Sequence, residues 1–77
     1  MAIKYVIIDE AFPIIFGEYF EHNQFSRLNV TSAGFCSFSI EGEIKVKVSG
    51  RSKSLDLESG EYDSFLLKKL LTKMFNP

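Results

Sequence analysis

The chain has 77 residues with a formal net charge of −1, and 45% of its residues are hydrophobic. This length fits one domain, predicted to span residues 1–77, and the balanced charge favours neither nucleic acid nor a basic partner. Cys36 is the only cysteine, which excludes an internal disulfide and a cysteine-rich zinc site. Because so small a chain needs further stabilisation, we expect its 8 Phe and 3 Tyr to fill the core and a contact between subunits.

The N-terminal half predicts one clear strand and a less regular remainder. Residues Ile3–Ile8 are β-rich and apolar on both faces, which indicates a central or well-covered strand. Pro13 opens a second apolar run, which is either a strand at a sheet edge or an irregular wrap. Beyond it we expect a turn of helix at Phe25–Leu28 and a connection at Asn29–Ala33. We recognise no secretion signal and no apolar stretch near the roughly 20 residues of a membrane span, so we expect a soluble, cytoplasmic protein.

The only histidine, His22, stands close to Glu18 and Glu21. In a helix, Glu18 and His22 would lie on one face; in a strand they lie about 13 Å apart, too far to share a metal ion. Pro13 and the apolar run before the segment disfavour a helix, so we expect a solvated polar bend without a metal. Cys36 is the only thiol that His22 could activate, and its position among apolar residues predicts burial. We therefore expect neither an enzyme nor a cofactor.

Residues 34–57 predict a three-stranded antiparallel meander, because apolar and polar residues alternate on both sides of a short turn. Gly42 provides the positive φ that this first turn needs. A third strand is expected at 53–57, so that one face is apolar and the other carries Ser, Lys and Asp. The alternating apolar positions of the first two strands are Cys36, Phe38, Ile40, Ile44, Val46 and Val48.

The C-terminal segment predicts an amphipathic helix at about 61–75 that covers the apolar face of the meander. Its expected core stripe consists of Tyr62, Phe65, Leu66, Leu70 and Met74. Leu67 and Leu71 flank this stripe and Phe75 extends it. With Phe35 of the sheet, these three are candidate interface residues for self-association or for another protein. The alternative is a helix sunk deep in a two-layer core, which would bury the surplus.

The polar face of the predicted sheet is basic. Lys45 and Lys47 project from one strand, Arg51 and Lys53 follow in the next turn, and Phe35 alternates onto the same face. Positive side chains beside an exposed ring resemble a platform for single-stranded nucleic acid. The alternative is a set of ordinary solvent-facing lysines that hinder edge-to-edge aggregation, which the acidic net charge favours.

Three fragments of the chain resemble a known group of proteins. They are residues 4–18, Thr31–Phe35 and Val48–Ser59, the last followed by Asp63. Together they are similar to small uncharacterised proteins encoded in bacteriophage and prophage genomes. The resemblance covers most of the chain and implies a phage-derived accessory or host-interaction factor, without catalytic or binding residues to carry over.

These features together predict an α+β fold. We expect an antiparallel sheet of four to five strands, including the meander at 34–57, with one C-terminal helix packed on one face. The predicted function is that of a small, non-enzymatic, self-associating interaction protein. The alternative is a nucleic-acid-binding module that uses the basic sheet face.

Overall fold

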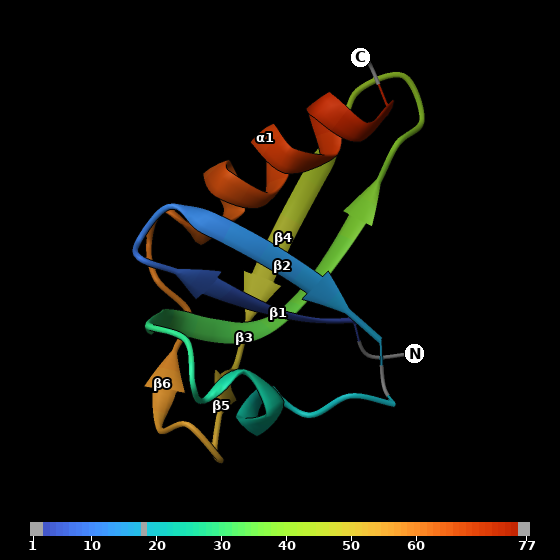
Figure 1. Ribbon diagram of the computed structural model, residues 1–77. Coiled ribbons are helices and arrows are strands. Elements are labelled where there is room, and N and C mark those ends of the chain that lie inside the picture. Colours follow the sequence, from blue (N-terminus) through green and yellow to red (C-terminus); the bar gives the residue numbers. More distant parts are fainter. Residues whose placement is uncertain (1–2, 18, 76–77) are drawn as a thin grey trace.

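The structure, a computed structural model, describes residues 3–17 and 19–75 and has the predicted α+β architecture. Its centre is β1 (Ile3–Ile8), which carries apolar side chains on both faces and therefore needs cover on both sides. The antiparallel sheet has the strand order β2-β1-β3-β4, so the predicted central place of β1 is confirmed (Figure 1). The other strands of this sheet are β2 (Phe12–Phe16), β3 (Val30–Ser39) and β4 (Lys45–Ser49).

The second apolar run forms β2, an edge strand. Pro13 lies opposite Ile7 of β1, and no further strand of the sheet pairs with the outer side of β2 among the residues described. Proline is tolerated at an edge because it has no N–H to donate to a neighbouring strand. Asp9 and Glu10 make the turn into β2 with φ values of 52° and 60°, and the Asn29 amide donates to the Asp9 carboxylate at 2.9 Å.

The connection predicted at Asn29–Ala33 is wrong over most of its length, because β3 already begins at Val30. Val30 lies opposite Ile8, the last residue of β1, and the ladder continues back along β1 to its first residue. The hydroxyls of Thr31 and Ser32, which suggested a loop, are hydrogen-bonded inside the fold and do not interrupt the strand. Tertiary pairing therefore overrides the local preference of Thr and Ser for turns.

The hairpin predicted for the first two strands of the meander is confirmed. In the β3–β4 ladder Cys36 lies opposite Val48 and Phe38 opposite Val46, so their apolar side chains share one face. Gly42 in the connecting turn has a φ of 70°, as the sequence predicts.

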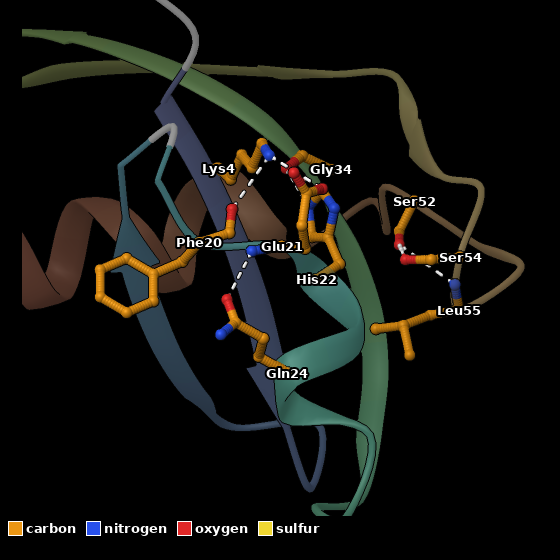
Figure 2. A network of polar contacts seen from close by, with 9 residues as sticks. All are labelled: Lys4, Phe20, Glu21, His22, Gln24, Gly34, Ser52, Ser54 and Leu55. Atoms are coloured by element: carbon orange, nitrogen blue, oxygen red, sulfur yellow. Dashed lines mark hydrogen bonds and ion pairs between the residues drawn. The ribbon is translucent and has the colours of Figure 1, made fainter.

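The third strand of the meander does not join this sheet, which corrects the prediction for residues 53–57. Gly50, with a φ of 73°, turns the chain away from β4. The chain then forms a separate small hairpin, in which the Ser52 hydroxyl accepts the backbone N–H of Leu55 at 3.3 Å (Figure 2). Ser52 and Asp56 are turn-forming residues, which explains why this stretch bends early. The strands of this hairpin are β5 (Arg51–Ser52) and β6 (Leu57–Glu58).

Both faces of the sheet are covered. The helix α1 (Asp63–Phe75) packs on one face, against a buried cluster of Tyr5, Ile7, Cys36 and Leu67. The short 3₁₀ helix η1 (His22–Phe25) and the β5–β6 hairpin lie on the other side (Figure 1). The cluster beneath them contains Val6, Phe16 and Ala33, with Phe25, Leu55 and Leu57 packed against it. The helical turn expected at Phe25–Leu28 thus forms three residues earlier.

The helix turns a different face to the sheet from the one predicted. Leu67 and Leu71 are 0% and 2% exposed, whereas Tyr62, Phe65 and Met74 of the expected core stripe are 69%, 65% and 61% exposed. Apolar residues occur on most sides of this helix, so their spacing alone allows two stripes. Asp63 lies on the buried side of the helix, one turn before Leu67 and two turns before Leu71. Because carboxylates are rarely buried, the sequence pattern did not indicate this side as the core face.

Candidate functional site

His22, the residue that first suggested a site, is buried and not solvated. It is 4% exposed, and its Nε2–H donates to the carbonyl oxygen of Gly34 at 2.9 Å (Figure 2). The rings of Phe16 and Phe35 stand edge-on to the imidazole, with centroids 5.4 and 5.6 Å away. The prediction of a solvated polar bend is therefore wrong for His22, whose ring packs against the sheet, whereas the neighbouring Glu21, Asn23 and Gln24 are exposed.

Lys4 connects the segment that contains His22 to β1 through two hydrogen bonds. Its ammonium group donates to the carbonyl oxygen of Phe20 at 3.0 Å and to the carboxylate of Glu21 at 3.2 Å (Figure 2). Gln24 accepts the backbone N–H of Glu21 at 2.7 Å, which closes the first turn of η1. These contacts and the His22 bond hold η1 against β1 and β3. We therefore assign this polar cluster a structural role.

The arrangement does not assemble catalytic or metal-binding groups around His22. Cys36 lies in the cluster on the α1 side of the sheet, whereas His22 packs with Phe16 on the opposite side, so the thiol and the imidazole do not meet. Burial raises the pKa of the Cys36 thiol, which keeps it protonated and unreactive. Within residues 3–17 and 19–75, no three His, Cys, Asp or Glu side chains are grouped to hold a metal ion. Glu18 lies outside the described residues.

A second buried polar cluster anchors the start of α1. The Asp63 carboxylate, 3% exposed, accepts hydrogen bonds from the Tyr5 hydroxyl at 2.5 Å, the Ser32 hydroxyl at 2.8 Å and the Gly60 N–H at 2.7 Å. Burial and the bond to Asp63 raise the pKa of Tyr5 above its usual range, so the phenol stays a donor. These three bonds satisfy the buried carboxylate, and they fix which side of the helix faces the sheet.

The most conspicuous surface runs along α1 where the helix meets the β1–β2 turn. We call it the α1 groove. Phe12 and Tyr62 are 64% and 69% exposed along it, and the half-buried Leu66 and Leu70 form its floor. Phe65, which is 65% exposed, extends this surface over the outer side of α1, beside Lys69 and Lys73. The residues that define the groove are Glu10, Phe12, Pro13, Glu61, Tyr62, Phe65, Leu66, Lys69, Leu70 and Lys73.

The charges of the α1 groove are separated along its length. Glu10 and Glu61 line the end near Tyr62, whereas Lys69 and Lys73 line the other end. The ion pairs of the described residues join Lys4 to Glu21, Arg51 to Asp56 and Lys68 to Glu43, and include none of these four groove residues. The groove therefore has an apolar middle, an acidic end and a basic end.

The structure separates the predicted interface residues. Leu67 and Leu71 belong to the core of the chain, so their side chains are removed from the accessible surface, as the alternative of a deeply sunk helix requires. Phe35 is half-buried against His22, and only Phe75, which is 49% exposed, remains a surface ring. Sequence reasoning missed Phe12, Tyr62 and Phe65 as surface residues. Asp63 is the signal that could have identified the two helix residues: if Asp63 is assigned to the buried side of α1, Tyr62 and Phe65 fall on the exposed side.

The predicted basic cluster is divided as well. Lys45 and Lys47 are exposed on the edge strand β4 and line a shallow hollow with Ser37 and Ser39 of β3. Arg51 instead pairs with Asp56 in the separate β5–β6 hairpin, and Lys53 lies exposed in the turn of that hairpin. The structure thus brings together two of the four basic residues and places the other two on a different element.

The comparisons with known proteins identify no relative. No protein-family model matches the chain, and neither a curated protein nor a solved structure is significantly similar to it. In the described part of the chain, α1 is too short and too polar to cross a membrane.

Proposed function

We propose that this protein is a small non-enzymatic interaction protein that acts as a homo-oligomer, with the α1 groove as its contact surface. The observation that carries the proposal is the exposure of three rings, each at more than 60%: Phe12 and Tyr62 line the groove, and Phe65 stands on the adjoining outer side of α1 beside Lys69 and Lys73. Exposed aromatic side chains on a small domain are typical of interfaces, where Tyr and Phe are enriched.

The energetics favour a contact of moderate strength. Fully burying a Phe side chain contributes about 1.5–3 kcal/mol, so two-thirds of that area is worth about 1–2 kcal/mol per ring. Three rings from each of two copies then contribute roughly 6–12 kcal/mol. This is of the same order as the cost of association, about 4–15 kcal/mol. Burial of the rings therefore offsets the cost of association, and a dissociation constant in the micromolar range, about −8 kcal/mol, requires a further contribution from the apolar floor and the charged ends of the groove.

The buried polar groups support a non-enzymatic role. His22 and Asp63 each make hydrogen bonds within the chain, and these bonds position η1 and α1. A general base needs access to a substrate proton, and neither group is more than 4% exposed. Their chemistry is therefore used for folding.

Sedimentation velocity across micromolar concentrations tests the proposal. We expect a reversible dimer whose population falls with dilution, and Phe65→Ser should shift the equilibrium toward monomer while the melting temperature measured in dilute solution, where both proteins are monomers, stays unchanged. Ile40→Ser is the matched control, because Ile40 is also an exposed apolar residue, at 40%, but lies just after β3, outside the groove. A strict monomer at every concentration would refute self-association.

Nucleic-acid binding is the second candidate, supported by the position of Lys45 and Lys47 on an uncovered part of the sheet. It predicts salt-dependent retention of single-stranded oligonucleotide. Lys45→Glu combined with Lys47→Glu should abolish that retention, and retention that survives the change would dismiss these two residues. The phage-derived accessory role is a proposal of another kind, and a gene neighbourhood of capsid, tail or integrase genes would support it.

A further inference from the structure

We propose that the partner in the α1 groove is a second copy of this chain, docked antiparallel about a two-fold axis that crosses α1 beside Leu66. This inference rests on the proposed function and specifies its geometry. Closed dimers use the same patch on both subunits, so the patch must be complementary to itself when rotated by half a turn.

The charge pattern of the groove meets that requirement. Glu10 and Glu61 lie at one end, Lys69 and Lys73 at the other, and Leu66 lines both halves. With a rise of about 1.5 Å per residue, α1 extends about 15 Å from Asp63 to Lys73, Glu61 lies just before its first turn, and Leu66 lies between the two charged ends. A half-turn about this point therefore sets the acidic end of one copy against the basic end of the other.

The same rotation also brings apolar residues of the two copies into contact. Tyr62 lies four residues before Leu66 and Leu70 four residues after it, so each Tyr62 ring meets the Leu70 side of the partner copy. Phe65 precedes Leu66 and adjoins Lys69 and Lys73 on the outer side of α1, so in this dimer the two Phe65 rings lie on either side of the axis. A parallel arrangement would instead place Glu61 beside Glu61 and Lys73 beside Lys73, which like-charge repulsion disfavours.

The charges needed for this contact are available. Lys68, the neighbour of Lys69, already pairs with Glu43 of its own chain at 3.7 Å, with both side chains on the surface. The ion pairs among residues 3–17 and 19–75 leave Lys69, Lys73 and Glu61 without an opposite charge within 4.0 Å. A second copy presents carboxylates to the lysines and lysines to the carboxylates at the same time.

A charge-swap experiment tests the geometry. The first variant carries Glu10→Lys and Glu61→Lys, and the second carries Lys69→Glu and Lys73→Glu. Each replaces two attractive ends by repulsive ones, so we expect each variant alone to dimerise at least about tenfold more weakly than the unchanged protein. An equimolar mixture of the two should form a heterodimer, detected by native mass spectrometry, because the opposite charges meet again.

The control and the outcomes separate this inference from the proposed function. Lys47→Glu with Lys53→Glu makes the same change in charge on β4 and in the turn of the β5–β6 hairpin, at exposed residues outside the groove, and should leave dimerisation unchanged. If both groove variants dimerise as well as the unchanged protein, the antiparallel contact is overturned while self-association stands. If the unchanged protein is a monomer, both proposals fail. Circular dichroism melts check that each variant remains folded.

Discussion

The hydrogen bond from Tyr5 to Asp63 is predicted to be a principal anchor of α1, and Tyr5→Phe removes it with little change in shape. Asp63 then keeps its bonds from Ser32 and Gly60 but loses its third donor while remaining buried. Hydrogen bonds to charged groups contribute about 1.5–3 kcal/mol, and we expect the free energy of unfolding to fall by this amount. Urea unfolding measures it, with an m-value unchanged by so small a substitution.

The same bond makes a prediction about alkaline pH. The pKa of Tyr5 is raised in the folded protein by burial and by the bond to Asp63, so the folded chain keeps the proton after the unfolded chain has lost it. The stabilisation is therefore complete below about pH 10, the pKa of an unfolded Tyr, and is lost above it at about 1.4 kcal/mol per pH unit. The difference in unfolding free energy between the unchanged protein and Tyr5→Phe should shrink over that range.

Comparison of the two proteins isolates Tyr5, because every other titrating group is common to both. Cys36, whose pKa burial also raises, contributes its own loss of stability at alkaline pH in both proteins, and this contribution cancels in the difference except for the smaller effect of the Cys36 charge on the pKa of Tyr5. A Tyr5→Phe protein that is as stable as the unchanged one at neutral pH would refute the anchoring role. Two pH profiles that run parallel above pH 10 would refute the account of the protonated phenol.

Three further predictions test packing. His22→Ala should lower the unfolding free energy by about 2–4 kcal/mol in chemical denaturation, because it removes a buried hydrogen bond and leaves a cavity between two rings; a loss under 0.5 kcal/mol would contradict the structural role. Gly34→Ala should cost about 1–3 kcal/mol or more, since its Cβ would lie 2.8 Å from a backbone carbonyl oxygen, whereas Gly17→Ala meets nothing within 4 Å and serves as control. Leu67→Ala should lower the unfolding free energy by about 2–5 kcal/mol and Phe65→Ala by less than about 0.5 kcal/mol. The reverse order would indicate that the stripe predicted from the sequence is the one that faces the core.

The parts of the fold that sequence predicts well are those where local pattern and tertiary environment agree. β1 is apolar on both faces and lies at the centre, and Gly42 stands between two alternating segments that pair as a hairpin. Both features are set by the burial of side chains that alternate along a strand. Sequence therefore predicts the sheet without knowledge of what covers it.

The parts that sequence predicts badly depend on side chains from distant elements. His22 is buried because Phe16, Phe35 and the carbonyl of Gly34 surround it, and no property of its own segment indicates this. The α1 groove was missed for a related reason. Its apolar rings occupy the outer side of α1 because Asp63, a residue usually found at the surface, is held inside.

The position of Asp63 bears on function as well as on folding. A chain of this size buries only about 60% of the surface its unfolded form exposes, so leaving large rings in water is costly for it. A helix rotated to bury Tyr62 and Phe65 would expose Leu67 and Leu71, and it would move Asp63 out of reach of Tyr5 and Ser32. The polar anchor and the burial of Leu67 and Leu71 thus favour the same orientation of the helix, and this orientation leaves Tyr62 and Phe65 in water. A second copy over the groove offsets that cost, and we accordingly expect the unchanged protein, but not Phe65→Ser, to become more stable to heat as its concentration rises through the micromolar range.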